Sequence, residues 1–235
     1  MSAPETSRTL GELVTEDPGA AKLFERLGLD FCCGGRQTLA EACDQRGLDA
    51  ATVSALLAAQ RSDPDGPPVE EHDVARASIT ELCDHIVSSH HERMRSELPA
   101  VSELAGTVVR VHGSDHPELL DLQRTFEGMR HELEEHMRVE EDLLFPACRS
   151  LDAGGDAAQL GDEVVSLLED EHAAVGNALA ALRELSGGYD ADAAFCNTHR
   201  RLLRSMHELE FDLHQHIHEE NNVLFGRVRD RLAVR

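Results

Sequence analysis

The stretch His136-Met-Arg-Val-Glu140-Glu-Asp-Leu-Leu-Phe145-Pro146 decides the fold, because a second version of it follows near the end of the chain. That version reads His216-Ile-His-Glu-Glu220-Asn-Asn-Val-Leu-Phe225-Gly226. In both copies a His is followed by Glu at the fourth position after it. An aliphatic residue, Leu and Phe then occupy the seventh, eighth and ninth positions. Agreement at so many fixed offsets indicates an internal duplication.

The duplication extends to one further His in each half of the repeat. His91 precedes His136 by nearly the same distance as His172 precedes His216. Each half is therefore expected to be a helix hairpin that carries one His on its first helix and the His-x-x-x-Glu pair on its second.

Apolar residues recur with a helical period from Ser78 onward, and turn-forming residues interrupt them at 113–117, 153–161 and 187–190. The pattern predicts long helices over residues 78–111, 117–150, 162–186 and 191–231. Short connections favour antiparallel neighbours, so we expect an all-α protein built on an up-down four-helix bundle. Pro99 predicts a kink or a local break in the first of these helices.

The N-terminal part of the chain is predicted to be a separate small helical domain. Residues 61–71 read RSDPDGPPVEE, a run of turn formers that no helix crosses. We place a linker at 61–74, between a domain of residues 1–60 and a bundle of residues 75–235. Short helices are expected over 10–15, 20–27, 38–43 and 50–60, the last with Asp49 as its N-cap.

The repeated His-x-x-x-Glu pair predicts a metal centre inside the bundle. Four residues advance a helix by ~6 Å and ~40° around its axis, so both side chains point to one place. Imidazole with carboxylate suits iron, and bundle cores hold di-metal carboxylate sites. A single such pair is usually a surface ion pair, but two copies with in-phase partners favour metal binding. The predicted ligands are His91, His136, Glu140, His172, His216 and Glu220.

The position of each residue around its helix distinguishes these ligands from neighbouring candidates. His91 continues an apolar stripe, whereas His90 is in line with the charged Arg93 and Glu97. Glu141 lies ~140° away from the face of His136, so Glu140 is preferred. Glu219 remains on a plausible face, and only Glu220 obeys the repeat.

Symmetry of the two hairpins further predicts that Glu140 and Glu220 each span both metals. Glu132 and Glu171 are open alternatives, either carboxylates that orient an imidazole or members of a solvated face. The other histidines are expected at the surface or around the ligands: His72, His85, His112, His116, His131, His199, His207, His214 and His218.

Composition excludes several classes of function. Acidic residues outnumber basic ones 45 to 22, for a formal net charge of -23, which argues against binding to nucleic acid or to anionic membranes. No apolar run is long enough to span a membrane, and the N-terminus has no signal-peptide pattern. We therefore expect a cytoplasmic protein whose cysteines are reduced thiols or metal ligands.

Adjacent cysteines in Asp30-Phe-Cys32-Cys33-Gly-Gly35 form the second motif. A stable disulfide between neighbours is strained, so a structural bridge is not expected. Placed before a helix N-terminus and beside Arg36, both thiols are predicted to be acidic and exposed, as in a redox or metal-handling pair. The alternative is two small residues in a tight turn.

With these motifs the chain resembles the RIC (repair of iron centres) family, in which a short Cys-Cys-Gly-Gly domain precedes a hemerythrin-like bundle. The resemblance runs through Leu10–Leu13, Asp30–Gly35, Asp84–Ile86 and both repeat copies, and the six predicted ligands match the family's positions. The sequence departs from the family at Gly226, where the first repeat and many relatives have Pro, and at His90, where an aromatic residue is common. The resemblance implies an oxo-bridged di-iron centre and repair of iron–sulfur clusters damaged by nitrosative or oxidative stress.

Three functions remain open from the sequence. The first is supply of iron to iron–sulfur proteins or to the machinery that assembles their clusters, with Cys32 and Cys33 helping the transfer. The second is reduction of nitric oxide to nitrous oxide at the di-iron centre. The third, O2 binding or sensing as in hemerythrins, is disfavoured because those carriers usually add a fifth His. NO and O2 are thus the small ligands to consider.

Overall fold

The computed structural model describes residues 4–61, 74–155, 160 and 162–233 of the chain. Within these ranges the secondary structure is helical, apart from one isolated bridge between Thr9 and Thr38. The all-α prediction is confirmed. Among the described helices, none combines the length and the apolar character needed to cross a membrane.

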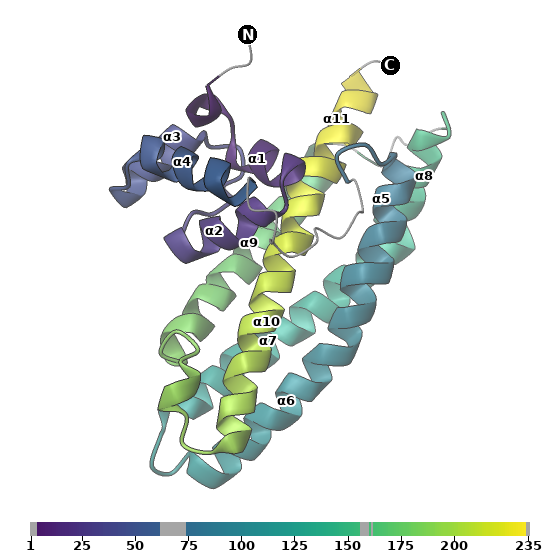
Figure 1. The fold of residues 1–235 in the computed structure, drawn as a ribbon. Coiled ribbons are helices and arrows are strands. Elements are labelled where there is room, and N and C mark those ends of the chain that lie inside the picture. The colour runs from purple at the N-terminus through teal and green to yellow at the C-terminus, as the bar shows by residue number, and fades with distance from the viewer. Residues whose placement is uncertain (1–3, 62–73, 156–159, 161, 234–235) are drawn as a thin grey trace. The chain divides into compact units, whose positions relative to one another are not determined.

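The chain divides into two compact units, and the first of them, residues 83–213, holds the bundle. Its long helices are α6, α7, α9 and α10, and η3 and α8 follow α7 before α9 begins (Figure 1). Its elements are α5 (Ile79–Ile86, shared with the other unit), η2 (Val87–His91), α6 (Glu92–His112), α7 (Glu118–Val139), η3 (Glu140–Leu144), α8 (Phe145–Asp152), α9 (Asp162–Leu185), η4 (Ala191–Ala193) and α10 (Asn197–His218, also shared).

The second unit combines residues 1–82 with residues 214–235. This differs from the predicted division at the linker, because side chains of the C-terminal segment pack against the N-terminal helices. The predicted linker itself, at residues 61–74, falls almost entirely outside the described residues. The unit's own elements are η1 (Glu5–Ser7), α1 (Leu10–Glu16), α2 (Gly19–Leu27), α3 (Leu39–Arg46), α4 (Ala50–Arg61), η5 (Glu219–Leu224) and α11 (Phe225–Ala233).

Local capping explains where the N-terminal helices begin and end. Thr9 and Thr38 each form a capping box with the Glu three residues later, which satisfies free backbone donors at the start of α1 and α3. Asp49 accepts hydrogen bonds from the backbone and hydroxyl of Thr52, as expected of the N-cap of α4. Gly28 and Gly47 end α2 and α3 with φ of 67° and 66°, a conformation that favours glycine.

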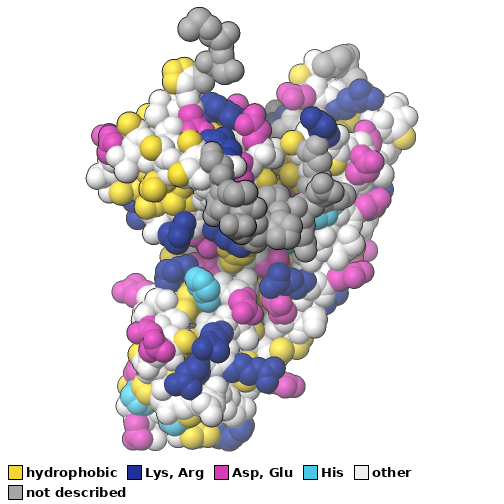
Figure 2. Space-filling view, viewed as in Figure 1, with side chains coloured by type: hydrophobic (Ala, Val, Ile, Leu, Met, Phe, Trp, Pro, Cys, Tyr) yellow, Lys and Arg dark blue, Asp and Glu magenta, His cyan; other side chains and the backbone are white. Residues whose placement is uncertain are grey.

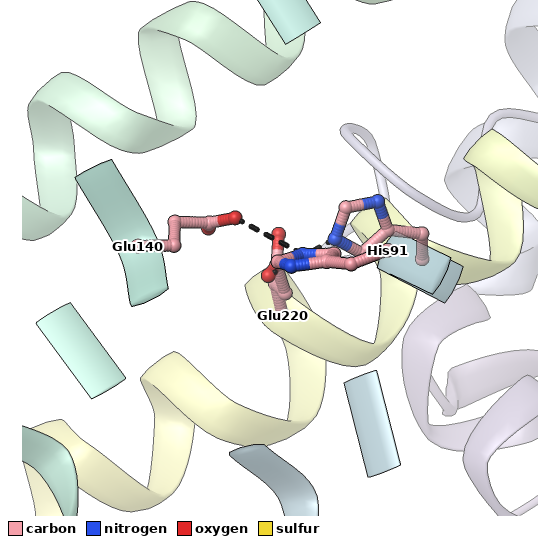
Figure 3. Close-up of side chains that lie close together, drawn as sticks. His91, Glu140 and Glu220 are labelled. Atoms are coloured by element: carbon pink, nitrogen blue, oxygen red, sulfur yellow. Dashed lines mark ion pairs between the residues drawn. The ribbon is translucent and has the colours of Figure 1, made fainter. Parts of the chain in front are cut away.

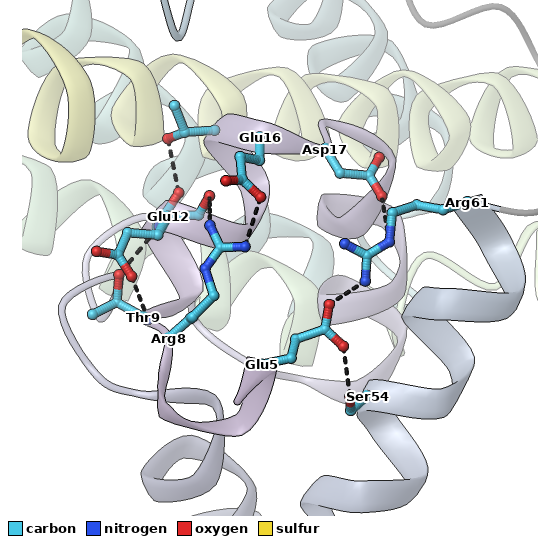
Figure 4. Close-up of polar contacts among 10 residues, drawn as sticks. Glu5, Arg8, Thr9, Glu12, Glu16, Asp17, Ser54 and Arg61 are labelled. Atoms are coloured by element: carbon cyan, nitrogen blue, oxygen red, sulfur yellow. Dashed lines mark hydrogen bonds and ion pairs between the residues drawn. The ribbon is translucent and has the colours of Figure 1, made fainter. Parts of the chain in front are cut away.

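A polar network ties the ends of the N-terminal helices together (Figure 4). Arg61, at the end of α4, pairs with Glu5 and approaches Asp17 to 3.9 Å. Glu5 also accepts a hydrogen bond of 2.5 Å from Ser54. Partial burial raises the pKa of Glu5, but the hydrogen bonds from Ser54 and Arg61 outweigh it and hold that pKa below its usual range. The network therefore joins η1 and α4 across a gap of almost 50 residues in sequence.

The bundle helices follow the predicted ranges closely, with two differences. The last of them, α10, begins at Asn197 and not at residue 191, because residues 191–193 form the separate 3-10 turn η4. α6 runs through Pro99 without interruption, so the predicted local break is absent. Leu98 and Val101 beside this proline are buried, and packing therefore holds the helix together there. On the face shown in Figure 2, acidic and basic side chains are interspersed, although acids dominate the chain as a whole.

Candidate metal centre

The bundle unit brings together four of the six predicted ligands. His91 is the last residue of η2, His136 lies in the final turn of α7, Glu140 begins η3, and His172 lies on α9. All four side chains are buried. They meet because each continues the apolar stripe through which its helix packs into the bundle.

Glu140 lies between two imidazoles of this unit. Its Oε2 is 3.3 Å from Nε2 of His91, as the dashed line in Figure 3 marks. Its Oε1 is 3.2 Å from Nε2 of His136, and Nε2 of His172 lies 3.0 Å from that same nitrogen. The donor atoms of His136, Glu140 and His172 all lie within 4.8 Å of one another, close enough to share a metal ion.

The surroundings of Glu140 fit a bound cation. Both carboxylate oxygens are buried, and neither accepts a hydrogen bond from the part of the chain that the structure describes. A buried carboxylate without a compensating charge destabilises a fold strongly. Each oxygen faces a different imidazole, so the two oxygens can serve two metal ions. Nitrogen and carboxylate donors of this kind suit iron.

Two further carboxylates fix the orientation of the imidazoles. Nδ1 of His91 lies 2.7 Å from Glu141, and Nδ1 of His136 lies 2.7 Å from Glu171. An ionised carboxylate only accepts hydrogen bonds, so in both rings the proton belongs on Nδ1. The lone pair of each ring is then on Nε2, on the side of Glu140, which is the arrangement of a metal-binding histidine.

Arg95 completes the outer contact of His91. It pairs with Glu141 at 2.6 Å. Partial burial raises the pKa of Glu141, but the hydrogen bonds from His91 and Arg95 overcome it and place that pKa below its usual range. Glu141 is therefore held in the ionised form that accepts the His91 proton.

The other unit presents the remaining predicted pair. Nε2 of His216, on α10, lies 3.1 Å from Oε1 of Glu220, in η5, and both side chains are buried. The pair repeats the i,i+4 geometry of His136 and Glu140, as the duplication predicts.

Three predicted ligands lie in π-helical turns, which the sequence did not reveal. η2 ends at His91, η3 begins at Glu140, and η5 contains Glu220. A π turn inserts one extra residue into a helix, shifts the side chains that follow it, and is often found at functional sites. The repeat therefore includes a backbone feature as well as a set of side chains.

The structure also places the neighbours of the ligands that the sequence set aside or left open. His90 is buried, and its Nδ1 lies 3.3 Å from Asp212 of α10. The helix periodicity predicts that His90 faces solvent, but α10 covers that face of the helix. Glu219 is also buried. Glu132 is exposed, so of the two open carboxylates only Glu171 contacts an imidazole. The position of Glu141 around its helix argues against its binding the same metal as His136. In the structure Glu141 contacts His91.

Two histidines expected at the surface or around the ligands are buried, and one of these joins the cysteine motif to the C-terminal segment. The ring of His218 packs edge-on against Phe31 at 5.8 Å, and its nitrogens approach Thr15 and Asn222 at 3.3 Å each. Burial lowers the pKa of His218 to about 4. His199 is the other buried case, and His72 lies outside the described residues.

The cysteine loop corrects the prediction that both thiols are exposed and acidic. Cys33 is exposed, but Cys32 is buried. A hydrogen bond to Cys33, burial, and the nearby Asp30 carboxylate together raise the pKa of Cys32 well above its ordinary value. The two sulfurs are 3.8 Å apart, so no disulfide joins Cys32 to Cys33.

Asn222 anchors this loop to η5. Its side-chain amide donates to the carbonyls of Phe31 and Cys32, at 3.2 and 3.0 Å. A Cβ on Gly35 would lie 2.4 Å from Asn222 and 2.5 Å from the Phe31 carbonyl, so only glycine leaves room there. The turn that carries Glu220 and the loop that carries the cysteines therefore belong to one packed unit.

Known proteins resemble the chain in both of its parts. Residues 6–61 match a domain of unknown function, DUF542, and residues 83–228 match the hemerythrin HHE cation binding domain. The iron-sulfur cluster repair protein YtfE of Yersinia pseudotuberculosis serotype IB (strain PB1/+) is 35% identical over 221 residues, which cover 94% of this chain and 96% of that protein. YtfE of Yersinia pestis (strain Pestoides F) matches with the same identity and coverage.

The order of the two matched domains and the near-complete coverage agree with the resemblance that the cysteine and His-Glu motifs indicate. A hemerythrin HHE domain binds iron, and the bundle unit holds the buried imidazoles and carboxylate that such binding needs. The chain belongs to the RIC family of hemerythrin-like iron–sulfur cluster repair proteins.

Proposed function

We propose that this protein repairs iron–sulfur clusters damaged by nitrosative or oxidative stress, and that it does so by supplying iron from a two-iron centre. The iron–sulfur proteins under repair are its partners. The six proposed ligands of that centre are His91, His136, Glu140, His172, His216 and Glu220.

The observation that carries the proposal is the environment of Glu140. Its two buried oxygens accept no hydrogen bond among the described residues, and each faces a different imidazole. One carboxylate can in this way join two ions, and the duplication assigns the same role to Glu220. The bound irons would supply the material that a damaged cluster has lost.

This chain's own residues have three tasks in that function. The imidazoles of His91 and His136 would bind iron through Nε2, because Glu141 and Glu171 hold their Nδ1 protons. The buried carboxylates offset the charge of the metals. The apolar bundle around them excludes bulk water, and release of iron must then pass through side chains that can exchange ligands with it.

A reconstitution assay tests the proposal. An iron–sulfur enzyme is inactivated with nitric oxide, freed of the gas, and mixed anaerobically with the iron-loaded protein and a chelator that captures free iron. We expect its activity to return with the loaded protein, and not with metal-free protein or with the His136→Ala variant. Equal recovery with metal-free protein would contradict iron supply.

The same preparation addresses nitric oxide reduction. The reduced, iron-loaded protein is titrated anaerobically with NO while nitrous oxide is measured. Iron supply predicts no more nitrous oxide than the bound iron can produce in about one turnover. Sustained production over many turnovers would assign the centre to catalysis instead.

A further inference from the structure

Three metal-binding side chains meet in the cysteine loop, outside the six-residue centre. Oδ1 of Asp30 lies 3.3 Å from Sγ of Cys32, which lies 3.8 Å from Sγ of Cys33. The donor atoms of all three residues lie within 4.8 Å of one another. The sequence motif contains Asp30 without assigning it a role of its own.

We infer that Asp30, Cys32 and Cys33 bind one divalent metal ion and leave one coordination position open. The inference rests on the proposed function and deepens it, since such a site can receive ferrous iron on its way to a damaged cluster.

The distances fit a tetrahedral ion. In a tetrahedral site with metal–sulfur bonds of ~2.3 Å, two sulfurs lie about 3.8 Å apart, and a sulfur and an oxygen lie about 3.5 Å apart. The loop has 3.8 Å between the sulfurs and 3.3 Å between Cys32 and Asp30. An ion could therefore bind with small adjustments of the side chains.

The solvent exposure of two of its three donors distinguishes this site from a structural metal site with a complete set of protein ligands. Cys32 is buried, whereas Cys33 and Asp30 are exposed, so the donors converge at the surface of the loop. Structural zinc sites have four protein ligands, and sites that exchange ligands keep three and an open position. Three donors at an exposed edge match the second class.

The loop backbone is fixed in the conformation that brings these donors together. Oδ1 of Asp30 accepts a hydrogen bond of 2.9 Å from the backbone N–H of Cys33. A Cβ on Gly34 would lie 2.8 Å from the Asp30 carbonyl, so the tight turn needs glycine. The side-chain amide of Asn222 donates a hydrogen bond to the Cys32 carbonyl. The inferred site is thus attached to η5 only two residues beyond Glu220.

Binding in this site changes protonation and leaves the oxidation state of the ion unchanged. Each thiol releases its proton as its sulfur binds the ion, and the carboxylate binds as it is. The two protons pass to the buffer, no electron is transferred, and the ion can later leave by exchange of thiolate ligands.

Cobalt titration tests the site. The iron-loaded full-length protein is kept anaerobic with a phosphine reductant and titrated with Co²⁺, which shows thiolate-to-metal charge-transfer absorption when sulfur binds it. We expect one further ion per chain with this absorption. Cys32→Ser and Cys33→Ser should abolish it, and Asp30→Asn should weaken binding by about tenfold or more, because one of three ligands is lost.

Two control variants accompany the titration. Asp44→Asn removes an exposed carboxylate from α3 in the same unit, and Cys196→Ser removes a thiol from the bundle unit. Both should bind Co²⁺ as the unchanged protein does. Absence of thiolate absorption at excess Co²⁺, or full affinity in Asp30→Asn, would overturn the inference. Either result would leave the reconstitution assay, and the function that it tests, unaffected.

Discussion

The two carboxylate oxygens of Glu140 face different imidazoles, one that of His91 and the other that of His136. If the carboxylate joins two metals, its conversion to an amide affects both. We expect Glu140→Gln to weaken the binding of both irons together, as measured by iron content during competition with a chelator. Retention of one iron at unchanged affinity, with loss of the other, would make Glu140 a ligand of a single metal.

The outer carboxylates give a second prediction at this scale. Glu141→Gln and Glu171→Gln each remove the charge that holds an Nδ1 proton, and each should lower iron affinity by about 10–100-fold without unfolding the bundle. Glu132→Gln is the matched control, since Glu132 lies one turn before His136 but is exposed. Iron competition measurements on the three variants suffice. An equal loss of iron affinity in Glu132→Gln would show that the losses come from the change in overall charge and not from a lost contact with an imidazole.

The sequence alone leads to a proposed ligand set, but it does not predict the contacts around those residues. The duplication singles out His136 and Glu140 because the same pair recurs at fixed offsets. Glu141 has no equivalent in the second copy, where Asn221 stands, and its partner His91 is on another helix. The burial of Cys32 likewise depends on packing around the loop, which the local motif does not contain.

At the scale of elements, the helix ranges follow from periodicity and turn residues, whereas the π turns do not. A π turn changes the hydrogen-bond register by one residue and leaves composition unaltered, so η2, η3 and η5 carry no signal in the sequence. Pro99 gives the opposite case. Its effect on the backbone is real, but burial of the adjoining residues of α6 outweighs the tendency to break.

The two copies of the repeat differ on their outer faces, which leads to a third prediction. Asp142 in the first copy is exposed and pairs with Arg138, while the equivalent Asn222 donates to the carbonyls of Phe31 and Cys32. Asn222→Ala removes one hydrogen bond to each of these two carbonyls and should lower the free energy of unfolding by about 1–3 kcal/mol. Asp142→Ala should change little. Denaturant unfolding of the metal-free variants measures both, and equal losses would contradict the anchoring role of Asn222.

The network of η1 and α4 predicts a dependence on pH. The pKa of Glu5 lies below its usual range in the folded protein, so its contribution to stability is present above the unfolded pKa of about 4.3. That contribution is lost as the pH falls through the folded value. Glu5→Gln should therefore destabilise the protein at pH 7, and the difference from the unchanged protein should shrink below about pH 4. Thermal unfolding at several pH values would reveal a constant difference if Glu5 were not involved.

At the scale of the whole molecule, the two compact units do not follow the order of segments along the chain. The proline-rich run predicts a boundary between N-terminal domain and bundle, and the matched domains respect that order. The structure nevertheless groups residues 214–235 with the N-terminal helices, because His218 and Asn222 pack against Phe31 and its neighbours. Contacts between segments so distant in sequence leave no periodic pattern, and only a structure reveals them.

The number of irons per chain and the magnetic coupling between them test the proposed two-iron centre most directly. The protein is made in iron-replete cells with ⁵⁷Fe, and its iron content is measured together with its Mössbauer spectrum in the oxidised state. A centre built from the duplicated His-Glu pairs predicts about two irons per chain, magnetically coupled to each other. The presence of one iron per chain, or of one tightly held zinc and no iron, would contradict it.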